Sequence, residues 1–289
     1  MNKNIAVFGA TGVFDVPVTI ALQEAGFKVS VMTTDVAAAR AVLPDTIEVV
    51  EGNLKYHHDL KRFLSTKQAV YCSLSVDMRE RAEDFHTETD GLREIINVSL
   101  ECGIKRIAYQ SSILQYNQVE DEDIWWVFKV KKDAVNYVRD CGIPFTIFYP
   151  STFMENFNST YRHGKMIQLV GESMFPIYFV SVDDYARTVV DSFRKLGTED
   201  KEYFVQGPDC YTLKEAANLF IKNSEKEKLR LHIVPVWWAR IRSLFSLKWK
   251  FIVELFEALN KNNEQFVSEA TWHELVKPRV KFVDFARKN

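Results

Sequence analysis

The chain has 289 residues, of which 47% are hydrophobic and 26% are charged, and its formal net charge is −2. This is the composition of a globular protein able to bury one large core or two modest ones. The near-neutral charge argues against nucleic acid as a partner, because no strongly basic field is available to hold phosphates.

The cysteines and the start of the chain favour a reducing cytoplasm. The four cysteines lie far apart and include no C-x-x-C pair, so neither a zinc site nor a disulfide framework is predicted. The chain reaches an apolar run by Ile5 without a signal sequence, and it has no run of about eighteen apolar residues. We therefore expect a cytoplasmic protein without a transmembrane segment.

The first predicted elements are a strand, a glycine-rich turn, a helix and a second strand. The apolar run Ile5–Phe8 leads into Gly9-Ala10-Thr11-Gly12, and a helical run separates this turn from the apolar run Val29–Met32. This order is typical of the opening unit of a dinucleotide-binding fold. Gly9 would make the tight turn, and Gly12 would let a pyrophosphate approach the free amides at the helix N-terminus.

Asp15 stands where the pattern G-x-x-G-x-x-G would place its third glycine. Its position predicts a helix N-cap, with the carboxylate accepting from the amides that a pyrophosphate would use. At about 5 Å from a phosphate oxygen and an effective dielectric near 20, this carboxylate would oppose binding by about 3 kcal/mol. Two alternatives follow: a dinucleotide site with Asp15 turned away, or an empty scaffold of the same fold.

The alternation of helices and strands continues through the first half of the chain. The apolar periodicity predicts helices over 36–43, 58–64 and 89–102, and strands over 47–50, 69–74 and 107–110. Parallel strands separated by helices imply a doubly wound α/β sheet, whose ligands bind at the carboxyl ends of the strands. His57 and His58 point apart on their helix and have no further ligand at a suitable spacing, so no metal site is expected.

The order of these motifs resembles that of the atypical short-chain dehydrogenase/reductases, and within them the NmrA-like family. The resemblance covers nearly the whole chain. It rests on the glycine turn, on Glu51-Gly52-Asn53-Leu54, on Gly103–Ile107 with Ser111-Ser112, and on Gly142–Ile147 leading to Pro150 and Phe153–Asn156. It implies an NAD(P)-binding Rossmann domain over residues 1–155 and a smaller mixed α/β substrate or partner region over residues 156–289.

The same resemblance implies cofactor contacts at the turn and at the strand ends. Asn53 would face the adenine, and Ser73 and Leu74 would line the ribose and the nicotinamide. The full set of implied contacts is Gly9, Thr11, Gly12, Val13, Phe14, Thr33, Thr34, Asn53, Ser73, Leu74, Lys131, Tyr149 and Phe153.

Cofactor choice is read at the end of the second strand. NADP-binding relatives commonly carry arginine at the position of Thr34, whereas Thr33-Thr34-Asp35 offers hydroxyls and one carboxylate but no cation. NAD is therefore slightly favoured over NADP, and the alternative that no cofactor binds stays open.

In active relatives a Tyr-x-x-x-Lys pair serves as proton donor and cofactor anchor. Lys131 takes the lysine position, but Val127 takes the tyrosine position, and a valine cannot exchange a proton. The alternative is that Lys131 is not an anchor and that Lys129, Lys131 and Lys132 form one solvated cluster on a helix.

Three tyrosines are candidates to replace the missing acid: Tyr109, Tyr116 and Tyr149. Tyr149 has the best position, because it ends a predicted strand at the carboxyl edge of the sheet. The competing interpretation is a half-buried packing residue with a hydrogen-bonded hydroxyl.

In the second half, Asp183 or Asp184 is expected to cap one helix, and Thr212 with Glu215 fits a capping box at another. The stretch from Pro235 to Leu259 is unusually rich in aromatic and basic residues. It predicts a core and pocket wall, a protein or membrane surface, or, least favoured, a nucleic-acid surface.

Three function classes remain. The first and favoured one is an NAD(P)-dependent oxidoreductase or epimerase-like enzyme with a non-standard active site, acting on a small organic substrate. The second is a regulator that senses the dinucleotide and contacts a protein partner, and the third is a non-catalytic assembly subunit. The sequence does not define the oligomeric state.

Overall fold

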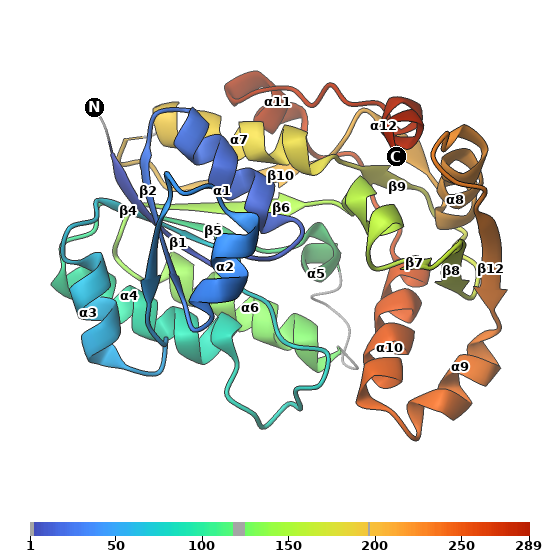
Figure 1. The fold of residues 1–289 in the computed structure, drawn as a ribbon, viewed down its shortest axis with the longest axis horizontal. Helices are drawn as coiled ribbons and strands as arrows, with labels where there is room; N and C mark the ends of the chain where they lie inside the picture. Colours follow the sequence, from blue (N-terminus) through green and yellow to red (C-terminus); the bar gives the residue numbers. More distant parts are fainter. Residues whose placement is uncertain (1–2, 118–124, 196) are drawn as a thin grey trace.

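The centre of the computed structural model, which describes residues 3–117, 125–195 and 197–289, is a seven-stranded sheet (Figure 1). The strand order is β10-β6-β5-β4-β1-β2-β3, and all neighbouring strands run parallel. The strands are β1 (Asn4–Phe8), β2 (Lys28–Thr33), β3 (Glu48–Glu51), β4 (Ala69–Cys72), β5 (Arg106–Gln110), β6 (Phe145–Pro150) and β10 (Lys201–Val205). The predicted doubly wound parallel sheet is confirmed.

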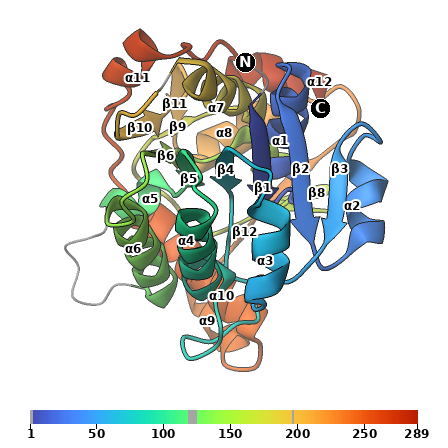
Figure 2. The same ribbon diagram turned by 90° about the vertical axis from the view of Figure 1, so that its left-hand side faces the viewer.

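Helices cover both faces of this sheet, as the nearly continuous apolar strands require. One face packs against α1 (Asp15–Glu24), α2 (Val36–Val42) and α7 (Val182–Lys195). The other face packs against α3 (His57–Leu64), α4 (Leu92–Glu101) and α6 (Trp126–Arg139). Figures 1 and 2 show α1 and α7 side by side on one face, with α4 and α6 on the opposite face.

A smaller mixed α/β region stands beyond the carboxyl end of the sheet, as expected (Figure 1). One of its sheets has the order β12-β8-β7, and the other pairs β11 with β9. Its strands are β7 (Arg162–His163), β8 (Met166–Val170), β9 (Ile177–Phe179), β11 (Asp209–Tyr211) and β12 (Arg230–Val234). Its helices are α8 (Leu213–Asn223), α9 (Val236–Ser243), α10 (Leu247–Lys261) and α12 (Phe282–Lys288), and α11 (Glu269–Glu274) lies near β10.

The two regions are not two consecutive stretches of chain. The main sheet takes its seventh strand, β10, from the second half of the sequence, and α7 packs beside α1. Phe153, which follows β6, forms a parallel β-bridge with Val180, which follows β9. The chain therefore crosses several times between the parallel sheet and the smaller region.

Local signals at helix starts had mixed outcomes. The capping box of Thr212 and Glu215 is confirmed at the start of α8. The prediction that Asp183 or Asp184 caps α7 is wrong, because the Ser181 hydroxyl accepts from the Asp184 amide at 3.1 Å. The Asp184 carboxylate instead accepts from the backbone amides of Arg279 and Val280, each at 2.8 Å, and so holds the C-terminal segment.

Other boundaries differ by a few residues. The helix expected over 89–102 begins at Leu92, after a short π-helical turn η1 (Thr87–Gly91). Two further short helices are α5 (Ile113–Asn117) and the 3-10 turn η2 (Met154–Asn158). Among the described helices, none has the length and apolar character needed to span a membrane.

Candidate functional site

The glycine turn packs closely against the end of β4. Gly9 has a φ of +86°, a conformation that favours glycine, and a Cβ at this position would overlap the carbonyl oxygen of Ser73. The Ser73 amide in turn donates to the Phe8 carbonyl at 3.0 Å. Backbone contact between β1 and β4 therefore fixes the shape of the turn.

Asp15 does not cap α1, so the N-cap prediction is wrong. The N-cap position is Phe14, and the Asp15 carboxylate accepts from the Ser73 hydroxyl at the end of β4. A Cβ on Gly12 would overlap this carboxylate, so a larger residue at position 12 would have to displace the Asp15 side chain. The structure thus has Asp15 turned away from the helix amides, which is the orientation that a dinucleotide site requires.

The environment of Asp15 changes its acidity. Desolvation raises the pKa of its carboxyl group to about 7, against smaller lowering effects of the Ser73 hydrogen bond and of the charge on Lys131. Near neutral pH the group is therefore divided between its neutral and charged forms. A negative charge beneath a candidate phosphate site is thus present only part of the time.

The outer side of the turn is open. Thr11 and Val13 are exposed, and the ring of Phe14 stacks on Phe153, with ring centroids 5.1 Å apart. This ring pair joins the turn to the segment that follows β6. In the first turn of α1 the amides of Asp15 and Val16 donate to the Gly12 carbonyl at 3.0 and 3.1 Å, and Pro17 has no N–H. An anion at this end of α1 would therefore meet the backbone of the turn before the helix.

Lys131 is held by a buried carboxylate that sequence reasoning did not find. Its Nζ lies 2.6 Å from Oε1 of Glu88, and the Tyr109 hydroxyl donates to the same oxygen at 2.7 Å. The Glu88 side chain is fully buried, and within the described residues its Oε2 has no hydrogen-bond partner. Burial, together with the Glu88 charge, holds the pKa of Tyr109 well above its usual value.

This arrangement sets Lys131 apart from its neighbours on α6. The Lys131 side chain is 17% exposed, whereas that of Lys129 is 70% exposed and pairs with Asp133. A single solvated lysine cluster is therefore not what the structure contains. One turn earlier, Val127 is buried against Val76 and Val130.

Lys131 lines a cavity of about 220 Å³ at the carboxyl end of the sheet. Its other walls include Phe14, Phe153 and Asn156 from the turns, and Leu255 and Glu264 from α10 and the loop after it. Glu264 accepts from the Ser151 hydroxyl at 2.9 Å and from the Gln206 amide at 2.7 Å. Burial raises the pKa of the Glu264 carboxyl to about 7, so this group can hold or release a proton near neutral pH.

Tyr149 lies apart from this cavity. Its hydroxyl donates to Glu202 at 3.0 Å and accepts from Arg139 at 3.3 Å. It lines a different pocket together with Tyr116. The structure thus joins Lys131 to Tyr109 through Glu88, and it separates both of them from the candidate donor Tyr149.

The residues expected around the adenosine gather at the ends of β2 and β3. Thr34 and Asn53 line a pocket of about 420 Å³ with Tyr56 and Arg62. Arg62, which sequence reasoning missed, comes from α3 and donates to the Glu51 carbonyl at 3.3 Å and to Asp59 at 3.2 Å. It brings to this pocket the cation that the end of β2 lacks, and its partner Asp59 and Glu51 line the same pocket.

The remaining residues near this pocket have structural partners. The Thr33 hydroxyl accepts from the Asp35 amide at 3.1 Å, and the Asp35 carboxylate caps α2 through the Ala38 amide at 2.9 Å. The carboxylate that favoured NAD in the sequence is therefore already engaged. Leu74, which was expected at the ribose and nicotinamide and not in this pocket, is buried directly after β4, next to Ser73.

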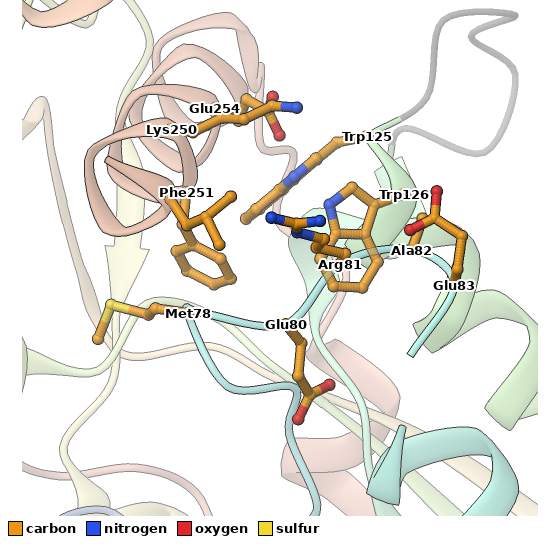
Figure 3. A pocket seen from close by; sticks show the side chains of 11 residues that line it. Met78, Glu80, Arg81, Ala82, Glu83, Trp125, Trp126, Lys250, Phe251 and Glu254 are labelled. Carbon is orange, nitrogen blue, oxygen red and sulfur yellow. The ribbon is translucent and has the colours of Figure 1, made fainter. Parts of the chain in front are cut away.

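A further cavity, of about 260 Å³, adjoins α10 (Figure 3). Figure 3 shows the rings of Trp125, Trp126 and Phe251 facing it, with Arg81 among them. Trp126 also stacks on His86, with ring centroids 5.0 Å apart. This cleft has apolar walls and a charged rim, and it shares α6 and α10 with the cavity at Lys131. Among the described residues, no group of three or more potential ligands is placed to hold a metal ion.

Comparisons with known proteins agree with this architecture. The model of the NmrA-like family matches residues 1–277. The structure of the NADPH-dependent quinone oxidoreductase QOR2 from Escherichia coli, complexed with NADPH, superposes with a TM-score of 0.76 at 18% identity, covering 98% of this chain and 99% of that one. Triphenylmethane reductase from Citrobacter, complexed with NADP(H), gives 0.75 at 16% identity, covering 99% of each chain.

A curated relative matches over a shorter stretch. The (4-alkanoyl-5-oxo-2,5-dihydrofuran-3-yl)methyl phosphate reductase of Streptomyces griseus is 26% identical over 173 residues. The match covers 58% of this chain and 56% of the relative, so the chain spans little more than half the length of that protein.

The acidity of Asp15 predicts a pH dependence of dinucleotide binding. Because the pKa is raised to about 7, the carboxyl group is mostly neutral at pH 6 and mostly charged at pH 8. NADH affinity should therefore fall over this range, by up to about tenfold if about 1.4 kcal/mol of repulsion develops. NADH is the suitable ligand because it lacks the 2'-phosphate, which would itself titrate near pH 6. Calorimetry at pH 6, 7 and 8 measures the effect.

Asp15→Asn is the control, because it keeps an acceptor for Ser73 and cannot ionise. Its affinity should be nearly independent of pH over the same range. An unchanged pH dependence in this variant would assign the titration to another group, such as Glu264.

Arg62 predicts a preference for the phosphorylated cofactor. Removing a cation that contacts a phosphate costs about 1.5–3 kcal/mol, so Arg62→Ala should weaken NADPH binding by at least about tenfold and NADH binding much less. Lys61→Ala is the matched control, because Lys61 precedes it on α3 but pairs with Glu101 at 2.9 Å. Equal losses for NADPH and NADH, measured by calorimetry, would remove Arg62 from the ribose site.

Proposed function

The chain belongs to the NmrA-like family, and from this premise we propose that it is a reductase that uses NADPH or NADH to reduce a small organic hydride acceptor. The observation that carries the proposal is the placement of Lys131. A positively charged side chain lines the cavity at the carboxyl end of the sheet, and a buried carboxylate fixes its position.

The described residues fit a dinucleotide along this edge of the sheet. The pocket at Thr34, Asn53 and Arg62 suits an adenosine and a 2'-phosphate. The turn that begins at Gly9 suits a pyrophosphate, because Asp15 is turned inward and Thr11 and Val13 leave the outer side open. The cavity at Lys131 then suits the nicotinamide end.

When bound, a reduced nicotinamide supplies a hydride. The part of Lys131 is to bind and orient, by donating hydrogen bonds to ribose hydroxyls at the mouth of the cavity. Glu88 restricts the ammonium to one place and balances its charge. The stacked rings of Phe14 and Phe153 form an apolar wall at the same end, which excludes water from the reacting groups.

The class of acceptor follows from the residues at the two positions where a proton donor is expected, Val127 and Tyr149. Val127 cannot supply a proton, and Tyr149 is engaged with Glu202 outside the cavity. The site therefore suits an electron-poor acceptor, such as a quinone or a cationic dye, which takes the hydride without simultaneous protonation. A cation then becomes a neutral product, whereas a quinone becomes a phenolate that still takes up one proton. Glu264, at the cavity wall, can hold such a proton near neutral pH.

The two structural relatives support this choice, since one is a quinone oxidoreductase and the other a triphenylmethane reductase. The second candidate function is a sensor that binds the dinucleotide without turning it over. The observation that favours it is the burial of Val127 in a small apolar cluster at the position of the donor.

Turnover separates these two candidates. We expect NADPH oxidation with naphthoquinone or with crystal violet, a cationic triphenylmethane dye. Lys131→Ala should lower kcat/KM by at least about tenfold, because a charge-assisted hydrogen bond of about 1.5–3 kcal/mol to the cofactor is lost. Absorbance at the nicotinamide band measures the rate.

Lys129→Ala is the matched control on the same helix and should retain full activity, because Lys129 is exposed and, within the described residues, pairs with Asp133 alone. Tight NADPH binding without oxidation by any acceptor would favour the sensor. Equal losses in the two variants would contradict the role given to Lys131.

A further inference from the structure

Helices α9 and α10 form an antiparallel hairpin whose turn lies at the edge of the molecule, away from the central sheet (Figure 1). The aromatic stretch predicted from the sequence divides here into two parts. Phe256 and Val253 are buried in the core of the smaller region. Other large apolar side chains are exposed: Leu244 by 78% and Phe245 by 85% at the turn, and Trp237 by 65% and Ile241 by 51% on α9.

Such exposure is unusual for a short segment. A stretch of ten residues, 236–245, carries five exposed large apolar side chains, and Leu247 adds a sixth at the start of α10. Isolated exposed apolar residues are common on protein surfaces, but a continuous group of them marks a surface that contacts something other than water.

The charges near the turn of the hairpin have one sign. Residues 236–253 include four basic residues and no acidic residue, on a chain whose net charge is −2. Arg242 lies over the rings of Trp238 and Trp249, 4.9 Å from each centroid. Lys248 stands beside the turn and is exposed. Only farther along α10 do acids appear, where Glu257 pairs with Arg240 at 2.8 Å.

This pattern identifies the chemistry of the occupant. Exposed tryptophan and aliphatic side chains with basic residues around them match the interface of an anionic lipid layer, where apolar side chains enter the acyl boundary and cations meet headgroup phosphates. A projecting turn suits a deformable lipid surface. A symmetric contact with a second copy would instead bring Arg242 and Lys248 against the same cations, which is unfavourable.

We propose that the turn between α9 and α10 is a membrane-docking element that inserts Leu244 and Phe245 into the headgroup region of an anionic bilayer. The chain then lies on the membrane and does not cross it. Leu247, Lys250 and Phe251 also line the cleft of Figure 3, so docking places this part of its wall close to the lipid.

Vesicle flotation with the full chain tests the proposal. We expect binding to vesicles in which about one lipid in four is phosphatidylglycerol, at least about tenfold tighter than to phosphatidylcholine alone, and weaker at high salt. The double substitution Leu244→Ser with Phe245→Ser should lower binding at least about tenfold, because it removes the apolar side chains of the tip. Lys248→Glu should lower it at least about fivefold.

Two matched substitutions on other faces should bind as the wild type does: Leu100→Ser, at an exposed leucine of α4, and Lys105→Glu, at an exposed lysine before β5. Quenching of wild-type tryptophan fluorescence by brominated lipid tests insertion without any substitution, since Trp237 is exposed. Equal binding to neutral and anionic vesicles, no quenching, or full binding by the hairpin variants would overturn the proposal. So would a wild-type dimer that the Phe245 substitution dissociates in sedimentation velocity, because it would assign the surface to self-association.

Discussion

The buried contact of Lys131 with Glu88 is the interaction on which the candidate site depends. A fully buried carboxylate is costly unless a partner balances its charge, and removal of one partner from such a pair typically costs about 3–5 kcal/mol. Here the ammonium of α6 and the hydroxyl of Tyr109 on β5 share one oxygen of a residue that follows β4. Three elements meet at this point. The pair therefore fixes the position of Lys131 in the cavity wall, and Lys131 is the residue that remains of the Tyr-x-x-x-Lys pair.

A second constraint works beside it at the glycine turn. The contact of Gly9 with the Ser73 carbonyl leaves no room for a side chain, and Asp15 fills the space beneath Gly12. An acid in this place would repel a phosphate if it faced the helix amides. Because it is desolvated, its charge is reduced near neutral pH although it accepts from Ser73, and the outer side of the turn stays open. The departure from the glycine pattern is therefore compatible with a phosphate site.

The features that the sequence predicted well are local or periodic. Apolar runs defined the strands, and a capping box four residues long defined the start of α8. The predictions of helix caps were wrong where a side chain bonds to a partner that is remote in the sequence. Asp15 bonds to Ser73 and not to the amides beside it, and Asp184 bonds to residues 279 and 280. Tyr149 was placed correctly at a strand end, but successive residues of a strand face opposite sides, and its hydroxyl reaches Glu202.

Glu88, Arg62 and Glu264 could not be found from sequence for a related reason. Each acquires its importance from residues that are remote along the chain, and none belongs to a motif with its own spacing. The central claim, that a dinucleotide lies across the carboxyl edge of the sheet, is tested most directly by hydrogen–deuterium exchange at about 1 mM NADPH, the upper end of the usual affinity range. The account predicts slower exchange in peptides covering residues 8–16 and 51–56 and no change over residues 236–247. Unchanged exchange at the glycine turn, or protection confined to other parts of the chain, would contradict it.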